Sequence, residues 1–221
     1  MNQHKEHQAS GEQSLDSNES MVLNALELAR AAAEQGHTVV LVEGISDQAA
    51  IDALSQRRGR NLEKERVTTV PIGGATKIGR FLDLLAPQHL NVKLAGLYDI
   101  GEERYFRRAL ERAGFASQLT RAGMERLGFY VCDADLEEEL IRSLGVDGVL
   151  RVMAAEGDLW KFKIFERQPE RHERSPAAQL RRWLGTTARR KRLYARLLVN
   201  ALDPNRVPEP LVRLLGHVGG G

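Results

Sequence analysis

Residues 38–54 have the sequence TVVLVEGISDQAAIDAL, in which a short β-branched and apolar run ends at an acid and a glycine. The run 38–42 has no polar alternation, which is typical of a strand buried on both faces. The pair Glu43-Gly44 indicates a sharp turn, and residues 46–57 have a helical pattern. The stretch therefore predicts a strand, a tight turn and a helix, the opening of a βαβ unit.

The same alternation continues on both sides of this stretch. Further strands are predicted at 67–72 (VTTVPI), 92–98 (VKLAGLY) and 128–132 (GFYVC), and further helices at 21–35, 76–85, 102–113 and from Asp135 onward. Crossovers of this length favour a mostly parallel, Rossmann-like α/β sheet with helices on both faces. Ligands of such sheets bind outside the carboxyl ends of the strands.

We expect three segments along the chain. Residues 1–19 are polar and lack apolar periodicity, which predicts a disordered tail. Residues 20–145 form the α/β core. Residues 146–221 form a helical C-terminal extension that packs on the core, with helices at 177–185, 189–202 and 209–217.

The composition predicts a soluble, cytoplasmic protein. The single cysteine, Cys132, cannot form an internal disulfide, and the Cys and His residues show no spacing of the zinc type. No apolar run approaches the roughly 20 residues that would cross a bilayer. We therefore expect no contact with a membrane.

Charge is distributed unevenly along the chain. Residues 132–139 (CDADLEEE) carry five acids and no base, whereas residues 171–196 carry eight arginines and one lysine against one acid. An acidic cluster and a basic stretch in one domain suit a site that holds a divalent metal ion and attracts phosphate. Solvated helix faces are the alternative explanation.

Carboxylates follow two of the predicted strands. Glu43 comes directly after the first, Asp47 lies one helical turn later, and Asp99 follows the strand at 92–98. The carboxyl ends of parallel strands meet at one edge of a sheet, so we expect these acids to lie together. The alternatives are a capping role for Asp47 and an Asx turn at Asp99.

Two further candidates lie on helices. Glu137 shares a helix face with apolar residues, unlike Glu138 and Glu139, and is the acid of its cluster that we expect in the site. Lys191 flanks the apolar stripe of the helix at 189–202 and could reach a phosphate. Its stem could instead cover apolar surface while its ammonium stays in water.

Four stretches resemble the Toprim domain of OLD-family nucleases. The string LVEGISDQAAIDAL (41–54) is similar to the first Toprim motif, and LAGLYDIGEE (94–103) to the second. DLEEELIRSLG (135–145) resembles the DLE helix of OLD-type domains, and RRKRLYARLLV (189–199) their later segment with a functional lysine. The resemblance implies that Mg²⁺ or Mn²⁺, as one or two ions, binds Glu43, Asp47, Asp99 and Glu137. It also implies catalytic roles for Glu43 and Lys191.

The sequence departs from that family in two places. Gly101 replaces the second acid of the Asp-x-Asp motif, which leaves Glu102 or Glu103 as substitutes for a second metal. No GxxxxGK[ST] loop occurs in the sequence, so we expect a stand-alone domain without the usual ATPase, and a separate ATPase is an expected partner. The glycine-rich loop at 72–76 could bind an anion with Lys77, or could simply form a tight turn.

The resemblance implies metal-dependent hydrolysis of phosphodiester bonds in nucleic acid, DNA more than RNA. Five basic residues are candidates for nucleic-acid binding: Lys77, Arg181, Arg182, Arg189 and Arg190. A non-catalytic module that binds nucleic acid or an ATPase is the first alternative, and Gly101 favours it. The second is a hydrolase of small phosphorylated substrates, which the arginine-rich stretch disfavours.

Overall fold

The computed structural model describes residues 3–86, 92–168 and 175–219, with side chains from residue 19 onward. Its centre is a four-stranded parallel sheet in the order β2-β1-β3-β4. The strands are β1 (Thr38–Val42), β2 (Val67–Pro71), β3 (Leu94–Asp99) and β4 (Phe129–Cys132). The predicted α/β class and the four predicted strands are confirmed, with ends that shift by one or two residues.

The strand order creates one switch point in the sheet. The chain moves from β1 outward to β2 and then returns past β1 to β3, so β1 and β3 are neighbours whose connections leave in opposite directions. In open parallel sheets the crevice outside the carboxyl ends of two such strands is the usual place for a ligand.

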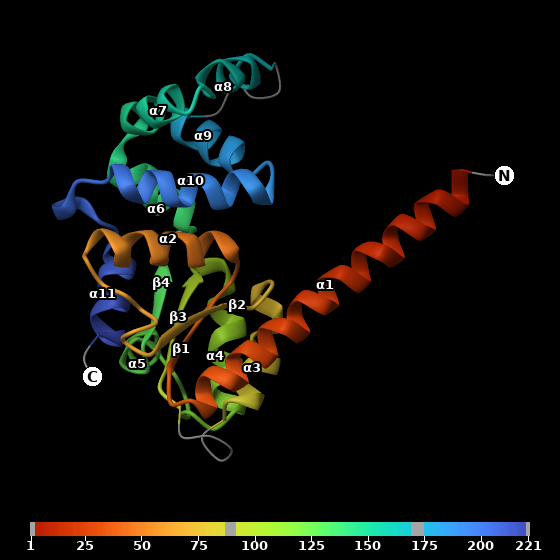
Figure 1. The fold of residues 1–221 in the computed structure, drawn as a ribbon, viewed down its shortest axis with the longest axis vertical. Helices are drawn as coiled ribbons and strands as arrows, with labels where there is room; N and C mark the ends of the chain where they lie inside the picture. The colour runs from red at the N-terminus through yellow and green to blue at the C-terminus, as the bar shows by residue number, and fades with distance from the viewer. Residues whose placement is uncertain (1–2, 87–91, 169–174, 220–221) are drawn as a thin grey trace.

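Both faces of the sheet are covered by helices (Figure 1). Val39 and Leu41 point toward α1 (Gln3–Glu34), α3 (Ile78–Leu84) and α4 (Glu103–Arg112). Val40 and Val42 point toward α2 (Ile45–Arg57) and α11 (Glu209–Val218). All four side chains are fully buried, which explains why β1 is uniformly apolar.

The C-terminal helices pack on the α2 side. They are α6 (Leu136–Leu144), α7 (Val146–Ala155), α8 (Leu159–Glu166), α9 (Pro176–Leu184) and α10 (Ala188–Ala201). Figure 1 shows α10 lying alongside α2, with α6 beside it. Leu198 and Leu214 belong to the same apolar cluster as Val42, so the core continues across the boundary predicted at residue 146.

The first helix differs from the prediction. Residues 3–19, expected as a disordered tail, are the first turns of α1, which Figure 1 shows running away from the body. The predicted helix at 21–35 provides a nucleus, and each preceding residue then adds one backbone hydrogen bond. Gln and Glu are frequent in 3–19 and are good helix formers, so the polar composition did not exclude a helix. Residues 1–2 lie outside the described part.

Short connections complete the structure. They are the 3-10 turns η1 (Ala75–Lys77), η2 (Ile100–Glu102) and η4 (Pro204–Arg206), and the helix α5 (Arg121–Arg126) before β4. Within the described ranges, no helix combines the length and the apolar character that crossing a membrane would need.

Candidate metal centre

Glu43 stands where β1 ends and the chain turns into α2. Its backbone carbonyl accepts hydrogen bonds of 3.1 Å from the N–H groups of Gly73 and Gly74. Its side-chain oxygen Oε2 is buried and has no hydrogen-bond partner among the described residues. Burial raises the pKa of the Glu43 carboxyl, although the Lys191 ammonium acts in the opposite direction. A buried carboxylate oxygen without a partner is costly unless a cation or a proton reaches it.

The contact with Glu43 also explains the glycine-rich loop. Gly73 and Gly74 have φ values of 75° and 111°, which favour glycine, and their N–H groups are already used by Glu43. The tight turn that was one reading of this loop is therefore present in the structure. Lys77 lies in η1 with its Nζ 4.0 Å from Oε2 of Glu19 on α1.

Asp47 caps α2 and also faces the acid cluster. Its Oδ2 accepts a 2.8 Å hydrogen bond from the N–H of Gly44, so the predicted capping role is present. Its pKa is raised to about 7, because burial outweighs the hydrogen bond from Gly44 and the attraction of Lys191. The charges of Glu137 and Glu43 raise it further.

Asp99 is the last residue of β3, at the switch point. No side-chain hydrogen bond from Asp99 caps the turn η2, so the Asx-turn alternative is not what the structure has. Its pKa is raised to about 8 by burial and then by the charges of Asp47 and Glu43. At Gly101, two residues later, no heavy atom of the described residues lies within 4 Å of the place that a Cβ would take. The position that lacks the second acid therefore has room for one.

Glu137 and Lys191 form an ion pair across α6 and α10. Nζ of Lys191 lies 3.1 Å from Oε2 of Glu137, whose side chain is 6% exposed. The other oxygen, Oε1, is buried without a partner among the described residues. Burial lowers the pKa of Lys191, but Glu137 and Asp47 raise it above its usual value. The ammonium therefore does not simply extend into water, which was the alternative to a role in the site.

Asp135 is a neighbour of the site that the sequence reasoning missed. It caps α6 by accepting a 2.8 Å hydrogen bond from the N–H of Glu138, and its Oδ2 lies 2.6 Å from Nη2 of Arg181. Its charge raises the pKa values of Glu43 and Asp99. The available signal was its position in the acidic run 132–139, three residues after the strand at 128–132.

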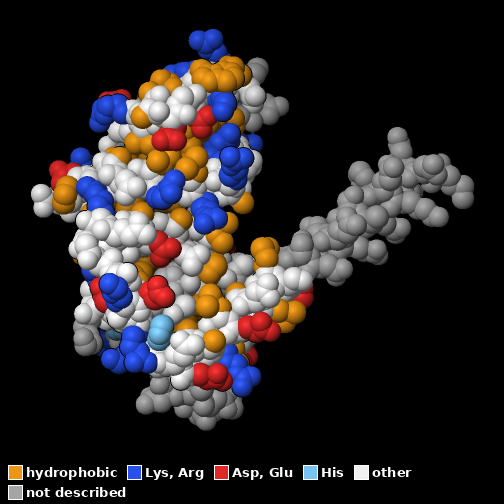
Figure 2. Space-filling view, viewed as in Figure 1, with side chains coloured by type: hydrophobic (Ala, Val, Ile, Leu, Met, Phe, Trp, Pro, Cys, Tyr) orange, Lys and Arg blue, Asp and Glu red, His pale blue; other side chains and the backbone are white. Residues whose placement is uncertain are grey.

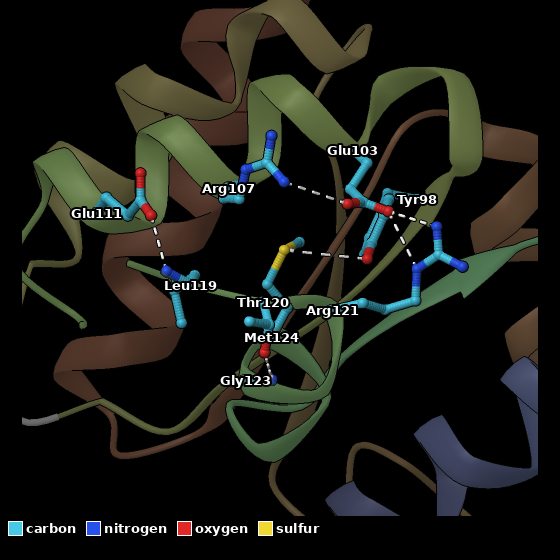
Figure 3. Close-up of polar contacts among 9 residues, drawn as sticks. All are labelled: Tyr98, Glu103, Arg107, Glu111, Leu119, Thr120, Arg121, Gly123 and Met124. Atoms are coloured by element: carbon cyan, nitrogen blue, oxygen red, sulfur yellow. Dashed lines mark hydrogen bonds and ion pairs between the residues drawn. The ribbon is translucent and has the colours of Figure 1, made fainter. Parts of the chain in front are cut away.

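Glu102 and Glu103 take different places. The charge of Glu102 raises the pKa of Glu43. The carboxylate of Glu103 binds Arg121 of α5 at 2.6 Å and Arg107 at 3.5 Å, as Figure 3 shows. Of the two candidate substitutes for the missing acid, Glu102 affects the pKa of Glu43 and Glu103 links α4 to α5.

The ion pairs of Glu103 belong to a group of polar contacts near Tyr98 (Figure 3). The Tyr98 hydroxyl is 4.0 Å from the sulfur of Met124, and Glu111 accepts a 2.8 Å hydrogen bond from the N–H of Leu119. These contacts hold the segment between α4 and α5 against the sheet. They stabilise the face of the sheet opposite α2, and none of them involves Glu43, Asp47, Asp99 or Glu137.

The basic candidates separate into distinct groups. Arg181 is paired with Asp135 next to the site, and Arg182 and Arg189 are exposed. The Arg190 guanidinium lies 4.0 Å from the ring centre of Trp183 and donates a 3.3 Å hydrogen bond to its carbonyl, which is a packing role. Figure 2 shows Lys and Arg side chains spread over the upper half of the body, where α7 to α10 lie.

The candidate ligands are all carboxylates, which suit a hard cation, although their side chains are not gathered closely around one point. In the described ranges, no three Asp, Glu, His or Cys side chains are close enough together to hold a metal ion. Glu43 and Glu137 nevertheless each have a buried oxygen without a partner there. Carboxylate oxygens are the ligands that Mg²⁺ and Mn²⁺ prefer.

Comparison with known proteins identifies the fold around these residues. Residues 36–100, which contain β1 to β3 with Glu43, Asp47 and Asp99, match the sequence model of the family "Overcoming lysogenization defect protein-like, TOPRIM domain". This part of the chain therefore resembles an OLD-like Toprim domain. We found no match among curated proteins.

Solved structures extend the similarity beyond the matched segment. The C-terminal region of the Xanthomonas campestris pv. campestris OLD protein has a TM-score of 0.62 and 20% identity, covering 82% of this chain and 93% of that one. The C-terminal region of the Burkholderia pseudomallei OLD protein has a TM-score of 0.62 and 18% identity, covering 82% and 96%. The similarity in fold therefore extends beyond residues 36–100.

Proposed function

We propose that this protein is a metal-dependent phosphodiesterase that cleaves nucleic acid. The observation that supports the proposal is a pair of buried carboxylate oxygens, on Glu43 and Glu137, that have no partner among the described residues, with Lys191 3.1 Å from Glu137 and Glu43 at the carboxyl end of β1. Clusters of carboxylates with raised pKa values are typical of functional sites. The likeness to OLD proteins supports the fold, and the activity is our inference from the site.

Each group of residues has its own task in this proposal. The four acids would hold Mg²⁺ or Mn²⁺, with Glu102 and Asp135 beside them. Such an ion polarises phosphate oxygens and activates water when bound. The Lys191 ammonium would neutralise the phosphate at which charge develops, and exposed arginines such as Arg182 and Arg189 would hold the nucleic-acid backbone. Contacts of this kind predict little sequence specificity and a strong dependence on salt.

Plasmid cleavage tests the proposal. Supercoiled DNA is incubated with the protein in Mg²⁺, in Mn²⁺ and in EDTA, alongside Glu43→Gln and Lys191→Ala. We expect nicking that needs metal and is lost in both variants. Glu27→Gln, an exposed acid on α1, is the matched control and should nick like the parent. Full activity of Glu43→Gln would remove Glu43 from the site.

A non-cutting module is the second candidate, and Gly101 is the observation that favours it. In that case the protein would bind DNA in a salt-sensitive way without cleaving it in any metal, and would need a partner such as a separate ATPase. A hydrolase of small substrates would instead be inhibited by mononucleotides, and would not require the exposed arginines.

A further inference from the structure

The ion pair between Lys191 and Glu137 involves a residue that we also expect to bind metal. Oε2 of Glu137 is occupied by the lysine at 3.1 Å, whereas Oε1 is buried without a partner among the described residues. Glu137 is 4% exposed, so water does little to balance its charge. In this arrangement a neighbouring ammonium supplies the balance.

The lysine acts on the whole cluster and not on one acid. Its positive charge lowers the pKa values of four carboxyls that come from different strands and helices, those of Glu43, Asp47, Asp99 and Glu137. Its own element, α10, lies against α2 and α6, which carry Asp47 and Glu137. The direct contact of the ammonium is with Glu137, and α10 holds it beside the two helices that carry Asp47 and Glu137.

A divalent ion bound to Glu137 would change this balance. It would provide the positive charge that the cluster lacks, and it would repel the ammonium at so short a distance. The attraction that holds Lys191 would then be weakened at the same moment as the metal arrives. The side chain is 38% exposed, so it has an open side to move toward.

We propose that Lys191 is the internal counter-ion of the carboxylate cluster, which a divalent metal ion displaces from Glu137 and so frees to contact the substrate phosphate. This inference rests on the proposed metal centre. Binding of the metal ion would then release Lys191. The metal ion and the ammonium would first compete for Glu137, and afterwards both would contact the substrate phosphate.

Metal affinity without substrate tests the competition. Mn²⁺ is titrated calorimetrically into the full chain, Lys191→Met, Lys191→Arg and Lys163→Met, and thermal unfolding of each is recorded in EDTA. Lys191→Met should bind Mn²⁺ more tightly, by a factor on the order of 5 to 150, and should unfold at a lower temperature in EDTA. Lys191→Arg should resemble the parent, because it keeps the charge. Lys163 pairs with Glu166 on α8 away from the cluster, so its variant should also resemble the parent.

The outcomes separate the two proposals. Equal or weaker Mn²⁺ binding by Lys191→Met overturns the counter-ion role and leaves the metal centre standing. Absence of Mn²⁺ binding in both the parent and Lys191→Met overturns the metal centre and the counter-ion role together.

A second measurement on the unaltered protein does not depend on how the variants fold. Lysines are acetylated with an amine-reactive ester, with and without Mn²⁺, and labelling is quantified by mass spectrometry. Labelling of Lys191 should rise with Mn²⁺ relative to Lys163. Unchanged labelling, while Mn²⁺ binds, overturns the proposal.

Discussion

Replacing Asp99 by Asn should stabilise the protein when no divalent ion is present. The folded state raises the pKa of Asp99 from 3.8 to about 8, so an ionised Asp99 opposes folding. Because the folded pKa lies above the unfolded one, the loss of stability is absent below pH of about 4 and grows until pH of about 8. Asn keeps the shape of the side chain and removes the charge.

The size of the effect follows from the same values. The rise from 3.8 to about 8 corresponds, at about 1.4 kcal/mol per pKa unit, to an upper limit of about 6 kcal/mol in the free energy of unfolding. Asp99 is only partly buried, so solvent screens its charge, and we expect a single substitution to recover about 1 to 3 kcal/mol. For a chain of this length, that raises the melting temperature by about 2 to 12 °C.

Thermal unfolding followed by circular dichroism measures the effect. The parent and Asp99→Asn are compared in EDTA at pH 4, 6 and 8, and again with Mn²⁺. Mn²⁺ should raise the melting temperature of the parent more than that of Asp99→Asn, because the parent keeps its metal ligand. Asp83→Asn is the matched control, because this acid forms an exposed ion pair with Arg112 and should be neutral or slightly destabilising when replaced. A lower melting temperature for Asp99→Asn in EDTA at pH 8 would refute the reasoning.

Three further tests address other parts of the site. Gly101→Asp should fit the open space at that position and strengthen Mn²⁺ binding about tenfold, as measured by calorimetry; unchanged affinity would mean that the introduced carboxylate does not reach the metal. Glu103→Gln should lower the melting temperature by breaking the link to Arg121 but leave Mn²⁺ affinity unchanged, and weaker metal binding would contradict the structural role. Arg190→Gln should lower stability through its contact with Trp183, whereas Arg189→Gln should weaken DNA binding in a filter or gel assay without changing stability; the reverse pattern would be inconsistent with the packing described.

Much of the sheet could be predicted because its signals are local. The uniformly apolar run before Glu43 reflects a strand buried on both faces, and Asp99 occupies the matching place on the neighbouring strand. Once a parallel sheet is assumed, the carboxyl ends of its strands must share an edge. The prediction that Glu43, Asp47 and Asp99 share one edge of the sheet therefore required little beyond pattern and topology.

The remaining features depend on tertiary contacts that no local pattern reveals. Lys191 meets Glu137 only because α10 docks against α2 and α6, whereas the sequence alone left open an ammonium that stays in water. Arg190 looks like its exposed neighbours in sequence, yet the fold places it over Trp183. Helix α5 has six residues, too few to show a period, and the polar start of α1 lacks the apolar stripe on which helix prediction relies.

The order in which the site's residues occur along the chain has a consequence for synthesis of the protein. Glu43, Asp47, Asp99 and Glu137 all precede Lys191, which lies on the second-last α-helix of the described chain. A growing chain on the ribosome would therefore present all four acids before their lysine partner had been translated. Until α10 has docked, Glu137 lacks the ammonium that offsets its charge, so this ion pair forms only after most of the described chain has been made.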